Sequence, residues 1–214
     1  MSTEKKEKGP KSIGREIFEW VYTIIIAVAI AFLIKGFLFD IVKVDGSSMF
    51  PTLVNNDRLI VTKLGYEPKQ GDIIILDSTY VKRNEYYSAL ESSTGEKLNT
   101  LDKTLKYFSL PSQLKKRYYV KRIVAMPGQT VDLKNGKVYI DGEMLDENYG
   151  YTQSIDMSVH YPVTVEEGKV FVMGDNREHS KDSRSSDLGQ VPFDAILGKS
   201  QVRIWPLTDI CITK

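Results

Sequence analysis

The chain has 214 residues, of which 42% are hydrophobic and 27% charged, a composition that supports a folded core and excludes disorder throughout. Its 29 basic and 28 acidic residues give a net charge of +1, so nothing global indicates nucleic-acid binding. One cysteine and two histidines exclude an internal disulfide and a site rich in Cys or His ligands, and we expect neither a metal ion nor a cofactor.

The first element is an apolar segment. Trp20 to Phe39 contains one charged residue, Lys35, and as a helix its 20 residues span about 30 Å, the thickness of a bilayer's hydrocarbon core. We predict one transmembrane helix over residues 18–39, although a cleaved signal peptide or a buried core helix shares part of this pattern.

The residues on either side of this segment indicate its orientation. Residues 1–17 contain five lysines and arginines, so the positive-inside rule keeps them cytoplasmic. Residues 40–214 are then expected on the outer side of the plasma membrane, as an extracytoplasmic domain behind a single-pass anchor.

The remainder of the chain has the pattern of short strands separated by turns. Asn135-Gly136 between two alternating segments predicts a hairpin, and Glu167-Gly168 predicts a second pair of strands around it. The expected fold is mainly β, with an antiparallel β domain after the N-terminal transmembrane helix. The predicted strands lie at residues 42–44, 59–61, 73–76, 118–126, 131–140, 163–165, 169–173 and 202–205.

Residues 78–117 interrupt the strand pattern. They contain eight basic and four acidic residues, net +4, and show no clean period, although residues 98–108 fit a helix. We predict an insertion on the rim of the domain, whose charge is either a solvated face or a contact with anionic lipid or substrate.

Three polar motifs carry the candidate chemistry. The segment 45–53 (DGSSMFPTL) contains Ser48, the apolar segment 118–128 contains Lys121, and the segment 173–184 reads MGDNREHSKDSR. Taken singly, they are a turn serine, a solvated lysine and a polar loop.

Taken together, in this order and behind an apolar segment, the motifs resemble those of the bacterial type I signal peptidases (leader peptidases), in their compact Gram-positive form. The resemblance covers nearly the whole chain, but the insertion is longer than in small members. It implies the β fold that these enzymes share with self-cleaving repressor proteases. It also implies a membrane-anchored serine endopeptidase that removes signal peptides from exported preproteins, typically after Ala-x-Ala. The implied partners are preproteins, membrane lipid and a nearby secretion translocon, without nucleic acid.

The same resemblance assigns roles to individual residues. Ser48 takes the position of the nucleophile and Lys121 that of the general base, in a Ser–Lys dyad. Ser180 matches the serine that orients the lysine, and Asp182 and Arg184 match a supporting charge pair. The third motif also contributes Gly174, Asp175 and Asn176. The substrate cleft is implied to be lined by Val42, Val44, Met49, Tyr119 and Val120, although any of these five may equally be a plain core residue.

Simple electrostatics sets a requirement for this dyad. A lysine is a base only when neutral, and holding it neutral at pH 7 costs about 4.6 kcal/mol from a reference pKa of about 10.4. Burial lowers a lysine pKa by up to roughly 3–5 units, so we predict that Lys121 is buried and neutral. The backbone N–H of Ser48 is the expected oxyanion donor. Some family members add a hydroxyl two residues earlier, where this chain has Gly46, so the second donor stays open.

Two other functions fit parts of the sequence. A self-cleaving repressor-type protease shares the Ser–Lys chemistry, but predicts a DNA-binding head that residues 1–39 do not provide. A signal-peptidase-like assembly factor, or a peptidase dedicated to a few surface proteins, remains the alternative.

Overall fold

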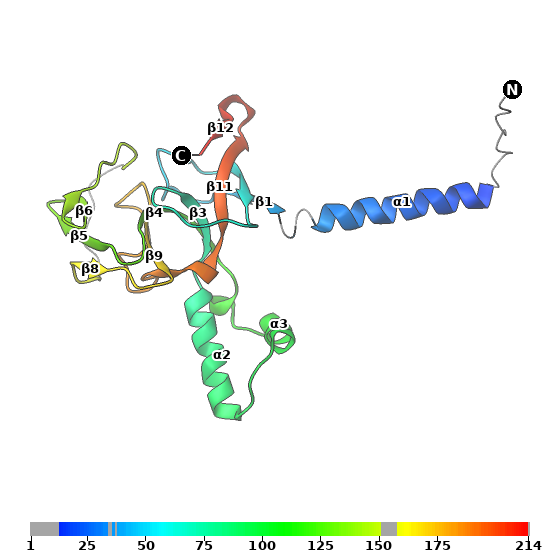
Figure 1. Cartoon of the computed structure of the whole chain (residues 1–214), viewed down its shortest axis with the longest axis horizontal. Coiled ribbons are helices and arrows are strands. Elements are labelled where there is room, and N and C mark those ends of the chain that lie inside the picture. Colours follow the sequence, from blue (N-terminus) through cyan, green and yellow to red (C-terminus); the bar gives the residue numbers. More distant parts are fainter. Residues whose placement is uncertain (1–12, 34–35, 37, 151–157, 214) are drawn as a thin grey trace, which may run out of the picture. The chain divides into compact units, whose positions relative to one another are not determined.

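A computed structural model describes residues 13–33, 36, 38–150 and 158–213 of the chain. It divides into two compact units, residues 1–39 and 40–214, which Figure 1 shows and which we describe separately. The division falls where the sequence changes from an apolar run to the pattern of short strands.

The first unit contains the helix α1 (Ile13–Leu33). Among the described residues, no helix combines the length and the hydropathy needed to cross a membrane. The predicted transmembrane segment, residues 18–39, continues through residues 34, 35 and 37, which lie outside the described part of the chain, as do most residues of the predicted cytoplasmic tail.

The second unit is built on a large sheet. Its strand order is β1-β2-β11-β3-β4-β9-β10, and β12 pairs with β11. The pairings from β2 onward are antiparallel, which confirms the predicted mainly β, antiparallel domain. The strands are β1 (Phe39–Lys43), β2 (Arg58–Thr62), β3 (Ile73–Asp77), β4 (Tyr118–Ala125), β9 (Lys169–Met173), β10 (Val191–Pro192), β11 (Ile196–Trp205) and β12 (Cys211–Ile212).

A smaller sheet has the order β7-β6-β5-β8. Its members are β5 (Thr130–Lys134), β6 (Lys137–Ile140), β7 (Glu143–Met144) and β8 (Val163–Thr164). The hairpin predicted at Asn135-Gly136 is confirmed: both turn residues have positive φ, 52° and 73°, as a type I′ turn requires. The two sheets share an apolar core that includes Val124, Val131 and Phe171.

The second predicted strand pair is wrong. Residues 163–164 pair with β5 in the small sheet, whereas residues 169–173 pair with β4 and β10 in the large one. The reason is burial. Four of the five β9 residues are fully buried, and because consecutive side chains point to opposite faces, both faces of this strand are covered. A central place in the large sheet provides that cover, whereas a two-stranded hairpin does not.

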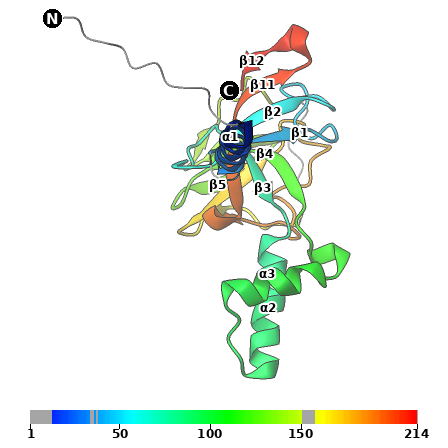
Figure 2. The same ribbon diagram turned by 90° about the vertical axis from the view of Figure 1, so that its right-hand side faces the viewer.

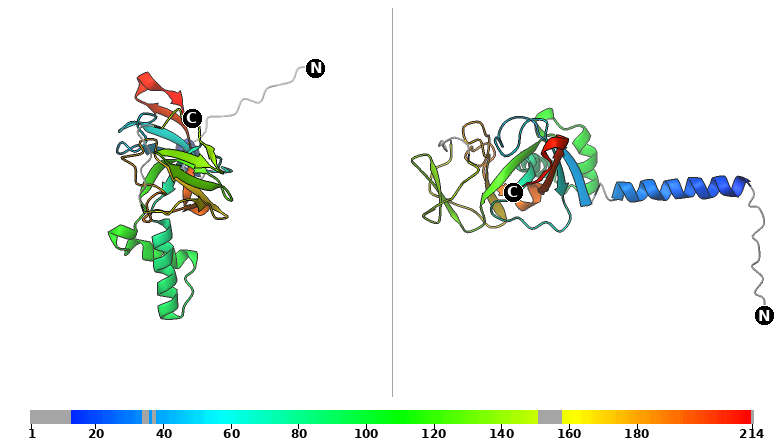
Figure 3. Two further views of the ribbon diagram at one scale, coloured as in Figure 1. Left: turned by 90° about the vertical axis from the view of Figure 1, so that its left-hand side faces the viewer. Right: turned by 90° about the horizontal axis from the view of Figure 1, so that it is seen from above.

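The insertion at residues 78–117 is helical. It forms α2 (Tyr80–Thr94), α3 (Thr100–Phe108) and the short 3-10 helix η2 (Ser112–Leu114), which extend from the sheets in Figures 2 and 3. The helix expected over residues 98–108 is confirmed as α3, while α2 went unpredicted because its apolar residues do not gather on one face. Two further 3-10 helices, η3 (Phe193–Ala195) and η4 (Leu207–Asp209), flank β11.

A buried ion pair joins the insertion to the sheet. The Arg83 guanidinium of α2 bonds to the carboxylate of Asp77, the last residue of β3, and to the hydroxyl of Thr79. Charged side chains this well buried are stable only when paired, so the pair fixes the base of α2. The phenol of Tyr87 on α2 donates a hydrogen bond to the backbone carbonyl of Lys103 on α3, and this bond holds α3 against α2.

Candidate active site

The structure brings Ser48 and Lys121 together. The Nζ atom of Lys121 lies 2.8 Å from Ser48 Oγ and donates to the carbonyl of Val120 at 2.9 Å. Lys121 belongs to β4, whereas Ser48 lies in the segment after β1, 73 positions earlier. These distances put an amine nitrogen in direct hydrogen-bond contact with a serine hydroxyl, the geometry by which a base activates a nucleophile.

The environment of Lys121 changes its basicity. The residue is 3% exposed, and burial lowers the pKa of its amine from about 10.5 to about 8. The carboxylates of Asp182 and Asp175 oppose that shift, while Arg184 adds to it. The predicted burial is confirmed, but the predicted neutral state at pH 7 is wrong, because a pKa near 8 leaves only roughly one such amine in ten neutral at that pH.

The segment that carries Ser48 is fixed from both sides. Met49 and Leu53 are buried in a core with Leu59 and Val61 of β2, so the next residue after the serine is an apolar anchor. Asn176 holds the backbone: its N–H donates to the carbonyl of Ser48 at 3.1 Å, and its side-chain amide donates to that of Ser47 at 3.2 Å.

The two chain segments approach closely at Gly174. A Cβ atom added there would lie 2.4 Å from the Ser48 carbonyl oxygen and 2.3 Å from Ser180 Oγ, distances that real Cβ atoms do not show. The Gly174 N–H donates to Asp182 at 2.9 Å. Glycine is therefore required because the backbone of Ser48 passes against it.

The predicted charge pair of Asp182 and Arg184 is formed. The guanidinium donates to both carboxylate oxygens at 2.8 Å, and both side chains are fully buried. The Nη2 atom of Arg184 also donates a hydrogen bond to the backbone carbonyl of Arg177 at 2.6 Å. The pair thus ties together the two ends of the loop in the third motif.

Asp175 anchors a network that sequence reasoning did not find. Its carboxylate accepts from the Arg122 guanidinium at 2.9 and 2.8 Å and from the hydroxyl of Thr52. Tyr149 covers the Arg122 guanidinium at 3.9 Å from the ring centroid. In the sequence, the available signal was Arg122 itself, a second charge directly after Lys121 and before the apolar residues 123–125.

The predicted orienting bond from Ser180 is not made. The Ser180 hydroxyl is buried, and it has no hydrogen-bond partner among the described residues. Lys121 is held instead by Ser48 and by the carbonyl of Val120. The Ser180 side chain occupies the space that a Cβ at position 174 would need, so glycine at that position leaves room for it.

A cleft of about 440 Å³ opens over the dyad. All five predicted substrate-binding residues, Val42, Val44, Met49, Tyr119 and Val120, line it together with Ser48 and Lys121. Sequence reasoning missed four further lining residues, Lys43, Asp45, Tyr118 and Lys181, three of which alternate with or directly precede predicted ones. The period of two in a strand could not have found Lys43, Asp45 and Tyr118, because it places them on the face opposite to their predicted neighbours.

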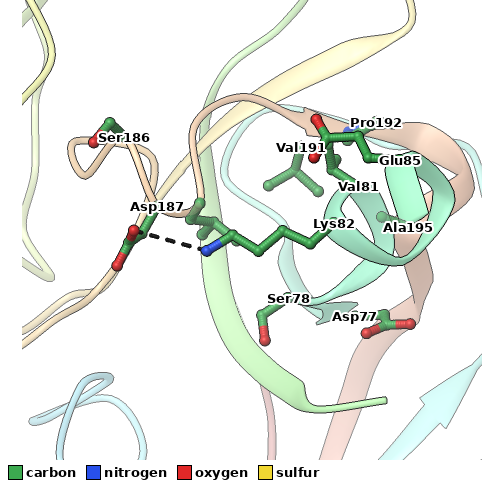
Figure 4. Close-up of a pocket in the computed structure, with 11 residues that line it drawn as sticks. Asp77, Ser78, Val81, Lys82, Glu85, Ser186, Asp187, Val191, Pro192 and Ala195 are labelled. Atoms are coloured by element: carbon green, nitrogen blue, oxygen red, sulfur yellow. Dashed lines mark ion pairs between the residues drawn. The ribbon is translucent and has the colours of Figure 1, made fainter. Parts of the chain in front are cut away.

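A second hollow lies between the insertion and the segment around Asp187. Figure 4 shows Lys82 of α2 reaching Asp187 across a pocket that Val81 and Ala195 also line. Asp187 also pairs with Lys181, which lines the cleft over the dyad. The rim of the cleft and the insertion are therefore joined through one carboxylate.

Together, the β domain, the buried lysine in contact with a serine hydroxyl and the open cleft are the arrangement that a serine hydrolase with a lysine base requires. A family profile described as "Signal peptidase, peptidase S26" matches residues 17–205. The chain belongs to this family, and it is an enzyme of the serine endopeptidase class.

Relatives match over the full length. The chain is 35% identical to a signal peptidase I of Bacillus amyloliquefaciens, with 100% of both chains covered. It is 36% identical to a signal peptidase I of Bacillus licheniformis, with 97% of both covered. A crystal structure of a signal peptidase I from Enterococcus faecalis V583 matches with a TM-score of 0.41 and 23% identity, covering 63% of this chain and 97% of that one.

Proposed function

We propose that this protein is a signal peptidase I, a serine endopeptidase that cleaves signal peptides from exported preproteins with Ser48 as nucleophile and Lys121 as general base. The observation that carries the proposal is the 2.8 Å contact between Lys121 Nζ and Ser48 Oγ in a site that lowers the pKa of the lysine to about 8. A neutral amine at that position accepts the serine proton.

The reaction follows in two halves. Ser48 Oγ attacks the scissile carbonyl carbon while its proton passes to Lys121 Nζ. The C–N bond then breaks, and the lysinium returns the proton to the leaving amine. Lys121, neutral again, takes a proton from water as the water attacks the acyl-enzyme, and the carboxylic acid is released with Ser48 restored.

The oxyanion needs a donor that is in place before the attack. The backbone N–H of Ser48 makes no hydrogen bond among the described residues, so it is available to the developing charge. The N–H of Gly46 donates to Asn55 Oδ1 at 3.1 Å and is therefore engaged. We assign the Ser48 N–H as the main donor, and Gly46 contributes no side-chain hydroxyl.

The substrate is proposed to bind as an added strand. β1 is the last strand of the sheet, and β4 pairs with β9 only over Arg122–Ala125, so residues 118–121 have one edge unpaired within the described structure. Both free edges border the cleft. Main-chain bonds to these edges would hold an extended peptide, and the apolar lining of Val42, Val44 and Met49 would admit only small side chains next to the cut.

We also propose the topology indicated by the sequence: residues 1–17 cytoplasmic, residues 18–39 a transmembrane anchor, and residues 40–214 an extracytoplasmic catalytic domain next to lipid and the translocon. The single cysteine, Cys211, is exposed and serves as the reporter. A membrane-impermeant maleimide should label it in intact spheroplasts. A Ser2→Cys variant, in a Cys211→Ser background, should react with the maleimide only after lysis. Labelling of Ser2→Cys, but not of Cys211, in intact spheroplasts would refute this orientation.

Cleavage of a purified preprotein with an Ala-x-Ala site tests the activity. Ser48→Ala and Lys121→Ala should each reduce kcat by roughly a thousandfold or more, because each removes one member of a unit. Matched controls are Ser47→Ala, the adjacent serine, and Lys137→Ala, an exposed lysine on β6, and both should cleave normally. Cleavage that survives Ser48→Ala would refute the assignment. Failure of the folded wild type would favour an assembly factor or a dedicated peptidase.

A further inference from the structure

The helix α3 exposes an apolar face. Leu101, Leu105 and Phe108 follow the spacing i, i+4, i+7, which places them on one side of the helix, and they are 65%, 63% and 75% exposed. No residue of α3 is buried. Three large apolar side chains in one exposed row are unusual on a soluble surface and indicate a contact partner.

The orientation of this face is fixed by the packing of the opposite side. The Lys103 ammonium lies 5.8 Å from the centroid of the Tyr87 ring, and Tyr107 accepts a bond from the N–H of Lys116 at 3.1 Å. A capping box of Asn99 and Asp102 starts the helix. α3 therefore packs on the insertion through polar and aromatic groups, the reverse of an ordinary surface helix.

The surroundings of α3 are basic. The insertion, residues 78–117, has a net charge of +4. One exposed cation, Lys106, lies on α3 itself. Four others flank the helix in the sequence: Lys97, Lys115, Lys116 and Arg117. A short amphipathic helix with Leu and Phe on one side and lysines around it has the composition of helices that lie in the interface of an anionic bilayer.

The position of α3 in the catalytic unit agrees with a membrane surface as its partner. Tyr118 lies within electrostatic reach of both Tyr107 of α3 and Asp40 of β1. In Figure 1, α3 and β1 both occupy the right-hand edge of the catalytic unit, and Figure 2, which faces that edge, shows α3 crossing in front of α2. β1 directly follows the proposed anchor, so this edge is the one that the chain connects to the membrane.

We propose that α3 is an interfacial helix, which inserts Leu101, Leu105 and Phe108 into an anionic membrane surface and so holds the catalytic unit against the bilayer. This inference rests on the proposed membrane anchor but not on catalysis. The insertion joins β3 to β4, and residues 118–121 of β4 border the cleft, so the contact sets the height and direction of the cleft above the lipid. A signal peptide would then leave the membrane beside the free edges that bind it.

The test is a fluorescent label on the apolar face of the full-length protein. Leu105→Cys, in a Ser48→Ala and Cys211→Ser background, is labelled with NBD and reconstituted into vesicles of phosphatidylcholine with phosphatidylglycerol. The emission should shift to the blue and be quenched by doxyl-labelled lipid. The matched control is Ser93→Cys on α2, an exposed position where the label should stay in water.

Further variants separate lipid from protein partners. Lys115→Glu with Lys116→Glu should abolish the shift in the anionic vesicles. Water-like emission from Leu105→Cys in anionic vesicles would overturn the proposal, as would a shift that appears only when a signal peptide is added or that depends on protein concentration in detergent. Because the nucleophile is absent, these results do not depend on the peptidase assignment.

An activity readout completes the test. In an otherwise wild-type chain, Leu101→Ser, Leu105→Ser and Phe108→Ser together should leave hydrolysis of a short soluble peptide in detergent unchanged, which also shows that the variant is folded. The same variant should cleave a membrane-inserted preprotein in anionic vesicles more slowly. Equal rates on both substrates would contradict the role of this face.

Discussion

Replacing Lys121 with methionine should make the protein more stable at pH 7 while abolishing its activity. Burial lowers the pKa of Lys121 from about 10.5 to about 8, so at pH 7 the folded state holds a protonated amine that would be better solvated in the unfolded chain. The corresponding cost is about 3 kcal/mol at about 1.36 kcal/mol per unit. Losing the hydrogen bond to the Val120 carbonyl offsets about 1 kcal/mol. The expected net stabilisation is about 2 kcal/mol.

The pH dependence of this effect identifies its cause. A lysine with a lowered folded-state pKa destabilises fully below that pKa, and the cost disappears as pH rises through 8 toward 10.5. The gap between the Lys121→Met variant and the wild type should therefore shrink, with only about 1 kcal/mol of the electrostatic cost left at pH 10.

Thermal unfolding of the full-length protein in detergent, followed by near-ultraviolet circular dichroism, measures this gap. At pH 7 the variant should unfold about 4–8 °C higher than the wild type, given about 2–4 °C per kcal/mol for a chain of this size. Lys137→Met, at an exposed position on β6, is the control and should change little. A Lys121→Met variant that is less stable than the wild type at pH 7, or equally shifted at pH 7 and pH 10, would refute the argument from burial.

Three more predictions concern the same site. The kcat/KM for an Ala-x-Ala peptide should rise about tenfold between pH 7 and pH 9 as Lys121 becomes neutral, and a profile without an inflection near 8 would contradict the base assignment. Gly174→Ala should lower kcat at least about tenfold by displacing the Ser48 backbone, whereas Gly14→Ala, which has nothing within 4 Å of the new Cβ, should have no effect in the same peptide assay. Asp175→Asn should destabilise the fold by about 3–5 kcal/mol in a denaturant titration, because it leaves the Arg122 guanidinium buried without its charge partner. Combining it with Arg122→Met should restore part of that loss, and a double variant no more stable than the single one would argue against the pair.

Local sequence patterns determined the strands and the motifs of this protein. Short runs of β-branched and apolar residues identified residues 59–61 and 73–76, and Asn135-Gly136 identified the hairpin, because each signal is complete within a few residues. The motif order also singled out Ser48 and Lys121, and a serine with no histidine base at hand required a buried lysine.

Only the tertiary structure decided which of these segments meet. The strand pair expected at Glu167-Gly168 divides between two sheets, because the burial of β9 requires neighbours from distant segments. The bond between Thr52 and Asp175 joins positions 123 residues apart, and neither residue carries a local signal for the other. Residues 98–108 fitted a helix in the sequence, but a predicted helix does not say which of its faces points outward. Packing against Tyr87 turns the apolar face outward, and the free edge at residues 118–121 likewise exists only because β9 stops pairing with β4 at Arg122.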